Sequence, residues 1–274
     1  MGKPKVTTEE IQASGAVSRE VYFQAVTFFT KVNRLSFEQT RSVAAIPETP
    51  KGDIKPQDVL DLVNAGLERL RFIKTELKIK QAAPKVASKP SVTPTDVFRS
   101  MVQLNRQLNL LLDDKFTPAE VYEQVSLGIG YAARLRSAFP GDRIPESPAI
   151  VPGKTPQDVY RQLYDCFTLI KQIADTSDLS MLDLKLSENS LDTVSPSDVY
   201  DIASLLISEL AFLHSTLESA PPPRKSVYPG RKIPSEVYQR SKLLELQLQE
   251  IHRLATSQPD RLRRVATDKP SSQN

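Results

Sequence analysis

A six-residue phrase that recurs seven times along the 274-residue chain constrains the fold more than any other feature. The copies are VSREVY (17–22), KPQDVL (55–60), TPTDVF (93–98), TPAEVY (117–122), TPQDVY (155–160), SPSDVY (195–200) and IPSEVY (233–238). A Ser or Thr at the first position caps exposed backbone N–H groups, and proline fits the first helical turn. The acid three residues after the cap completes a capping box. We therefore expect a helix to begin at each copy.

The valine in the fifth position of each phrase gives all copies a common register. Corresponding valines in the two halves are separated by 138, 140 and 140 residues (Val21 to Val159, Val59 to Val199 and Val97 to Val237). A fixed period of this kind indicates an internal repeat. The sequence therefore predicts a tandem duplication with a unit of about 140 residues and four helices in each unit.

The duplication predicts where the domains begin and end. We expect a polar N-terminal tail at 1–16, a first four-helix unit at 17–154 and a second unit at 155–274. The copy of the fourth helix would begin near Pro259, but the chain ends shortly afterwards in the polar sequence DKPSSQN. The second unit should therefore hold three helices and a partial fourth.

The apolar residues that follow each phrase predict the fold class. They stand four, seven, eleven and fourteen positions after the valine, as in Leu163, Cys166, Ile170 and Ile173. This alternation is typical of helices that bury one face in a bundle. We expect an all-α fold of tandem duplicated, up-and-down four-helix-bundle-like units, with seven long helices plus a short or truncated eighth.

Long proline-rich linkers join the predicted helices, and the chain has 21 prolines against nine glycines. The segment 113–116 is the one short connection, and it predicts an antiparallel helical hairpin. The other linkers run ~11–19 residues, which is long for a compact domain. An extended proline-rich linker at ~3.1 Å per residue could run back along its helix and start the next one parallel to it. This path stays open beside the up-and-down arrangement.

Composition limits the classes of partner. The hydrophobic content of 39% and the charged content of 25% are typical of a globular protein. A net charge of +3 is too small to indicate nucleic acid, and no apolar run approaches the ~20 residues that span a membrane. We expect a soluble protein with no nucleic-acid partner and no membrane span. The compartment is unknown, and a periplasmic fragment that has lost a signal or anchor is one option.

The layer seven positions after the valine combines small and large side chains. Its members with unusual size are Phe28, Gly66, Gly128 and Cys166. Small residues in a core layer usually make room for large neighbours, and a buried thiol is usually inert. The alternative is a small-walled ligand pocket formed by these four residues at mid-bundle.

Metal or cofactor chemistry has little support in the sequence. The two histidines, His214 and His252, both stand fifteen positions after their valine and would flank the seam. No second ligand shares a helix with either at metal-binding spacing. We therefore expect no cofactor and no metal site, and these histidines are the candidates for one.

The function predicted from these features is non-enzymatic. The sequence has no phosphate loop, no dinucleotide fingerprint and no paired catalytic carboxylates. We expect a helical-bundle protein with a structural or protein-interaction role, in which the incomplete second unit leaves a groove for a protein partner or for self-association. The residues expected to line that groove are Leu206, Leu210, Leu244, Leu248 and Ile251. The alternative is a sensory or ligand-binding bundle that holds a small molecule between helices.

Overall fold

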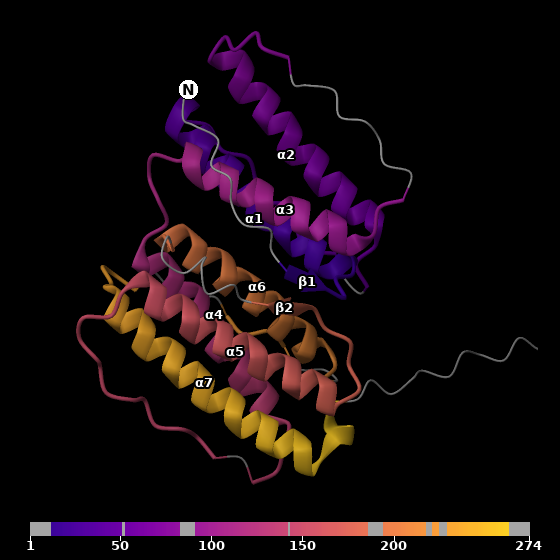
Figure 1. Ribbon diagram of the computed structural model, residues 1–274, viewed down its shortest axis with the longest axis vertical. Helices are drawn as coiled ribbons and strands as arrows, with labels where there is room; N and C mark the ends of the chain where they lie inside the picture. Colours follow the sequence, from indigo (N-terminus) through magenta and orange to yellow (C-terminus); the bar gives the residue numbers. More distant parts are fainter. Residues whose placement is uncertain are drawn as a thin grey trace, which may run out of the picture.

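The computed structural model describes residues 12–50, 53–82, 91–141, 143–185, 194–217, 221–224 and 229–262. Its fold is all-α, with seven long helices packed against each other (Figure 1). The helices are α1 (Ser18–Thr40), α2 (Pro56–Glu76), α3 (Pro94–Leu111), α4 (Pro118–Ser137), α5 (Pro156–Thr176), α6 (Pro196–Ser215) and α7 (Pro234–Ser257). Two short strands, β1 (Gln12–Ser14) and β2 (Asp183–Lys185), pair antiparallel beside them. The helical period had given no sign of these strands.

Every helix begins at its copy of the recurring phrase, which confirms that prediction. In all seven, the acid of the phrase accepts a hydrogen bond from the backbone N–H of the cap residue at 2.7–3.0 Å. The hydroxyl oxygens of Thr93, Thr117 and Thr155 each accept a hydrogen bond from the backbone N–H of that acid. Local capping chemistry therefore fixes where each helix starts.

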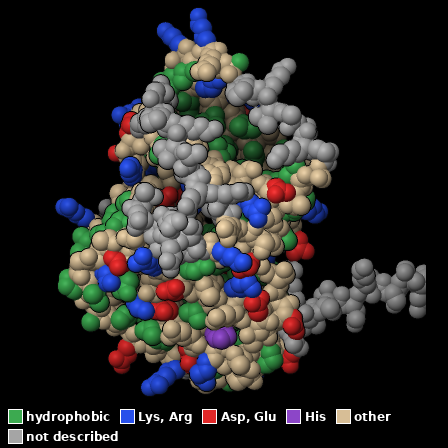
Figure 2. Space-filling model, viewed as in Figure 1, with side chains coloured by type: hydrophobic (Ala, Val, Ile, Leu, Met, Phe, Trp, Pro, Cys, Tyr) green, Lys and Arg blue, Asp and Glu red, His purple; other side chains and the backbone are tan. Residues whose placement is uncertain are grey.

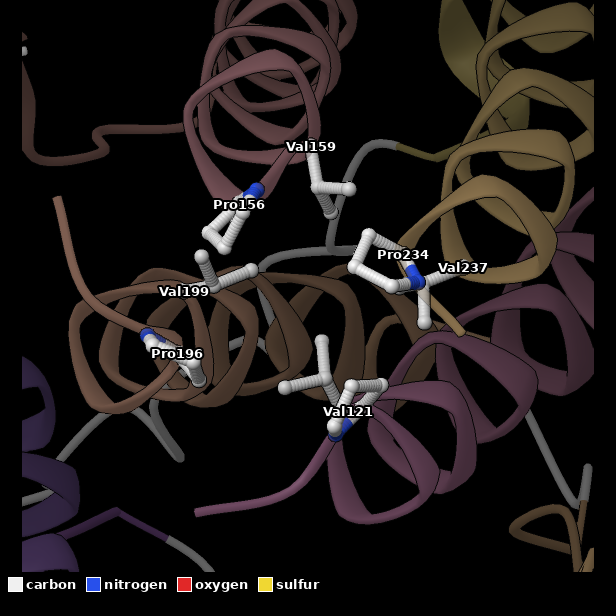
Figure 3. A pocket seen from close by; sticks show the side chains of 8 residues that line it. Val121, Pro156, Val159, Pro196, Val199, Pro234 and Val237 are labelled. Carbon is white, nitrogen blue, oxygen red and sulfur yellow. The ribbon is translucent and has the colours of Figure 1, made fainter. Parts of the chain in front are cut away.

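The helices α4, α5, α6 and α7 form a closed four-helix unit. Both α4 and α5 pack against α6 and α7, so α4 and α5 lie on one diagonal of the bundle. All four helices run in the same direction, because their first turns surround one end of the bundle (Figure 3). The up-and-down arrangement expected from the sequence is therefore wrong for this unit.

The linker between α4 and α5 explains the parallel direction. The backbone N–H of Arg143 donates to Glu250 near the end of α7, and Gln239 near its start donates to the carbonyl of Pro148. The N–H of Lys154 then donates to Ser235 in the first turn of α7. The linker thus runs the length of α7 backwards and delivers the chain to the end where α4 began.

The helices α1, α2 and α3 form a second, open group, which we call the three-helix unit. Both α2 and α3 pack against α1 but make little or no contact with each other. The hydroxyl of Tyr22 donates to the carbonyl of Glu48, so the linker after α1 also returns toward the start of that helix. The backbone N–H of Ala16, just before α1, donates to the hydroxyl of Thr95 in the first turn of α3, so the two helices begin at the same end of the unit.

The position of α4 differs from the grouping expected from the sequence. The expected unit 17–154 combined α4 with the first three helices, whereas α4 packs in the four-helix unit. The predicted hairpin at 113–116 is also wrong, because α3 and α4 make little or no contact. The short connection instead carries the chain from one unit to the other (Figure 1).

Within the described residues, which end at Leu262, the expected eighth helix amounts to a single turn. The 3-10 helix η2 (Pro259–Arg261) follows α7, and the next residue, Leu262, is buried in the core of the four-helix unit. Residues 263–274 and most of the expected N-terminal tail lie outside the described residues. No helix in the described part of the chain is long and apolar enough to cross a membrane.

Candidate functional site

The helix α2 has a free side. Its buried residues are Val59, Leu62, Gly66 and Ile73, whereas each of the other long helices buries between six and thirteen residues. Each helix of the four-helix unit has at least two helical neighbours, whereas α2 and α3 each have α1 alone as a close neighbour among the described helices. This difference locates the part of the fold that remains open.

An apolar stripe on α2 continues the buried face of the helix toward its free side, since Val63 and Leu70 stand at the register positions four and eleven residues after Val59. Leu60, Val63, Leu67 and Leu70 follow each other at alternating spacings of three and four residues, which places them on one face of the helix. Leu60 is 51% exposed and Leu67 is 38% exposed, while Val63 and Leu70 are half-buried against the core of the three-helix unit. We call these four residues the α2 stripe.

The helix α3 supplies the opposite wall. Val97, Leu104 and Leu111 recur at seven-residue intervals, and each is half-buried against the same core. Together with the α2 stripe they flank a position beside α1 that no described helix fills. Hydrophobic side chains lie in a recess in the upper part of Figure 2, which α1, α2 and α3 occupy in Figure 1.

Side chains at the same register position are more deeply buried in the four-helix unit than in the three-helix unit. Eleven residues after the register valine, Leu70 of α2 is half-buried, whereas Leu210 of α6 and Leu248 of α7 are fully buried. Fourteen residues after it, Leu111 of α3 is half-buried and Ile251 of α7 is fully buried. The three-helix unit therefore lacks a fourth neighbour at register positions that α4 covers in the other unit.

The groove expected in the second unit is closed. Its five expected lining residues, Leu206, Leu210, Leu244, Leu248 and Ile251, are at most 1% exposed. The helix α4 fills this side of the bundle, because the chain crosses into the four-helix unit after α3. An open helix position exists, but it lies beside α2 and α3 instead of beside α6 and α7.

The four residues of the expected mid-bundle pocket separate into two units. In the three-helix unit the ring of Phe28 fills the space over Gly66, where an added Cβ would lie 2.2 Å from the ring. In the four-helix unit Gly128 faces Leu206, Leu210 and Leu244. Cys166 is fully buried, its Sγ donates to the carbonyl of Ser241, and burial raises the pKa of its thiol. The small residues are thus packed against large neighbours.

The two histidines lie on different helices across a diagonal of the bundle. His214 of α6 is buried with its ring edge-on to Tyr131 of α4, and burial lowers the pKa of its imidazole. His252 is half-exposed on α7. Among the described residues, no group of three His, Cys, Asp or Glu side chains lies close enough to hold a metal ion.

An apolar hollow lies at the end of the four-helix unit where all four helices begin (Figure 3). Each helix contributes the proline and the valine of its phrase, and the lining is Pro118, Val121, Pro156, Val159, Pro196, Val199, Pro234 and Val237. The volume is about 240 Å³ including the part that is open to solvent, which is below the usual size of a ligand pocket. The lining offers no polar side chain to orient a substrate, so the hollow can take at most one small apolar group.

Buried ion pairs join the two units, and sequence reasoning had missed them. Arg19 of α1 contacts Glu209 of α6 at 2.9 Å and also contacts Glu20. Burial raises the pKa of Glu209 to about 8, although Arg19 opposes the shift. Lys31 of α1 contacts Asp201 of α6 at 2.6 Å, and burial lowers the pKa of Lys31 and raises that of Asp201.

These pairs set the relative direction of the two units. The start of α1 meets the end of α6, so the units pack antiparallel to each other. The two partners in each pair are separated by 190 and 170 residues, so no local pattern in the sequence announces them. Both pairs are structural, because each acid is matched to a cation at the interface of the two units.

Comparison of the chain with protein-family models, with curated proteins and with solved structures finds no match.

Proposed function

We propose that this chain is a non-enzymatic helical-bundle protein with a protein-interaction role, and that it binds its partner at the open helix position between α2 and α3. The observation that carries the proposal is the α2 stripe. Leu60 and Leu67 widen the apolar surface of α2 beyond the face that packs in the core, which is typical of a helix that has another neighbour. Helix-in-groove binding needs such anchors at three- and four-residue spacing.

We also propose that the chain arose by tandem duplication of a four-helix unit. Each half repeats the same neighbours, because α1 packs on α2 and α3 as α5 packs on α6 and α7. In this view α4 occupies the place of the truncated eighth helix. The three-helix unit is then the half that lost its fourth helix, which accounts for its open position.

Site-specific crosslinking in cells tests the interaction role. A photo-crosslinking amino acid would replace Leu67 in the α2 stripe, and a matched control would replace Leu246, a 36% exposed leucine on α7. We expect adducts from position 67 and few or none from position 246. Equal yields at the two positions, or none at 67, would refute the proposal.

A second candidate function is the binding of a small apolar ligand in the hollow at the start of the four-helix unit. Its lining of four prolines and four valines favours this alternative. Thermal melting with and without benzene, a small apolar probe, would test it, with Val159→Leu as the variant that fills the hollow. A benzene-dependent rise in Tm that Val159→Leu removes would support the alternative, and an unchanged Tm would exclude it.

A further inference from the structure

We infer that residues 221–224 form a pH-sensitive switch, which packs against α4 and α6 while His214 is neutral and detaches when His214 takes up a proton. We call this segment, with the sequence PPPR, the proline strap. It lies in the linker between α6 and α7 and is held by two contacts, one to His214 and one to Gly130. The strap belongs to the four-helix unit, so the switch is independent of the interaction role proposed for α2 and α3.

The first contact is a hydrogen bond between the imidazole of His214 and a backbone group of Pro221. Because proline has no backbone N–H, this group is the carbonyl, and His214 is the donor. The Nε2 atom of His214 has no partner among the described residues, so the donor is Nδ1. The neutral imidazole therefore holds the strap at its first residue.

The second contact joins Pro223 of the strap to α4. An added Cβ at Gly130 would lie 2.7 Å from Cβ and 3.4 Å from Cγ of this proline, so only glycine allows so close an approach. Pro223 is half-buried, whereas Pro221 and Pro222 are exposed. A segment with so few buried contacts can open while the rest of the fold stays closed.

The closed strap leaves no place for a second proton on His214. The residue is 6% exposed, and its ring lies edge-on to Tyr131 of α4 with the ring centroids 5.4 Å apart. The Nε2 atom is buried, and a proton there would be a donor without a described acceptor. A buried cation with an unpaired donor is costly, whereas water satisfies the same donor once the strap has detached.

The charges around His214 also oppose its protonation. Burial is the largest cause that lowers the pKa of His214, and the guanidinium of Arg134 on α4 lowers it further, while the bond to Pro221 opposes the shift. Charged groups on the other helices next to α6 are engaged in ion pairs, which are Arg19 of α1 with Glu209 of α6 and Lys171 with Asp175 within α5. The described surroundings thus give His214 a neighbouring cation and no compensating carboxylate.

The direction of the pH effect follows from the lowered pKa of His214. The closed state binds the proton less tightly than the open state, in which the pKa returns toward its ordinary value of 6.5. Closure is therefore fully favoured above pH 6.5 and becomes weaker as the pH falls below that value. Since one proton is taken up, the ratio of open to closed strap should rise by up to about tenfold for each pH unit.

Double electron–electron resonance tests the switch with one spin label on Arg224→Cys in the strap and one on Ser137→Cys at the end of α4. Both positions are exposed, while Cys166 is fully buried and should stay unlabelled. We expect one short distance at about pH 8 and a longer component that grows as the pH falls below 6.5. Circular dichroism should give the same helix content throughout, because opening is confined to the strap.

Three substitutions in the labelled chain identify the cause. His214→Gln keeps a neutral donor for the carbonyl of Pro221 and should keep the short distance at every pH. His252→Gln, the matched control on α7, should respond to pH like the parent chain. Gly130→Ala displaces Pro223 without any titration, so it should give the longer distance at every pH.

The inference has clear points of failure. An unchanged distance distribution in the parent chain between about pH 8 and about pH 4.5 would overturn it. A longer component that grows equally in His214→Gln would also overturn it, because another group would then control the strap. A short distance that persists in Gly130→Ala would show that the contact of Pro223 with α4 does not hold the strap.

Discussion

Two glycines at the same register position should respond in opposite ways to alanine substitution. Gly66 of α2 and Gly128 of α4 both stand seven residues after the valine of their phrase. At Gly66 an added Cβ would lie 2.2 Å from Cε1 of Phe28 and 3.0 Å from two further ring atoms. At Gly128 the nearest atoms are leucine methyl groups at 3.4–3.6 Å, which is ordinary contact.

The magnitudes follow from two competing contributions. Alanine in place of glycine within a helix stabilises the folded state by about 1 kcal/mol. Overpacking a core costs about 1–3 kcal/mol, and the ring of Phe28 is fully buried and cannot move into solvent. We therefore expect Gly66→Ala to lower the free energy of unfolding by up to about 2 kcal/mol. Gly128→Ala should raise it by up to about 1 kcal/mol.

Denaturant unfolding followed by circular dichroism measures both effects, and the double variant Gly66→Ala/Phe28→Leu identifies the cause. A smaller side chain at position 28 leaves a cavity by itself, but it makes room for the added methyl group at position 66. The two substitutions should therefore cost less together than the sum of their separate costs. If Gly66→Ala is as stable as Gly128→Ala, or if the two costs simply add, the proposed packing of Phe28 over Gly66 is incorrect.

Other substitutions test the ion pairs and the caps. Burial raises the pKa of Glu209 from 4.5 to about 8, so the folded state holds this proton more tightly and the associated stability is lost as the pH rises through that range. Tm should therefore fall between pH 5 and pH 9, and Glu209→Gln should flatten this part of the profile measured by calorimetry. Asp201→Ala leaves Lys31 buried without its carboxylate and should cost about 3–5 kcal/mol in denaturant unfolding, most of which Lys31→Met in the same chain should restore. Thr155→Ala removes a hydroxyl cap and should cost about 1 kcal/mol, whereas a cost below the error of the measurement would contradict the capping argument.

The starts of the helices were predictable because their cause is local. A capping box needs only the cap residue and the acid three positions later, and both lie within one phrase. The bond from the N–H of Thr155 to Asp158 spans three residues and is fully specified by the sequence. The same holds for the period that places Leu163 and Ile170 in the core.

The pairing of the helices was not predictable, because it depends on where the linkers run. Hydrogen bonds such as those from Arg143 to Glu250 and from Gln239 to Pro148 connect residues about a hundred positions apart. Lys31 and Asp201 are likewise ordinary charged residues until the fold brings them together. The grouping of α4 followed from these distant contacts, and the direction of the helices followed with it.

The candidate site was predicted in kind but in the wrong unit. The sequence indicated that the second unit has one helix too few. We therefore expected an open helix position beside α6 and α7. Leu60 and Leu67 contained a signal for the correct place, because they widen the apolar surface of α2 beyond the register positions that follow Val59. That signal becomes decisive only when α1 is known to cover one face alone.

The parallel direction of the four-helix unit has a consequence for how the chain folds. The consecutive helices α4 and α5 lie across the bundle diagonal, as do α6 and α7, and the consecutive neighbours α5 and α6 run parallel. No hairpin of two adjacent helices can therefore form early and serve as a template for the others. Folding rates fall as contacts connect more distant residues, so this unit should fold more slowly than an up-and-down bundle of the same size and stability. A circular permutant would open the chain within 138–155 and join the original ends of the four-helix unit by a new linker. Its folding rate should change, while the native contacts stay the same.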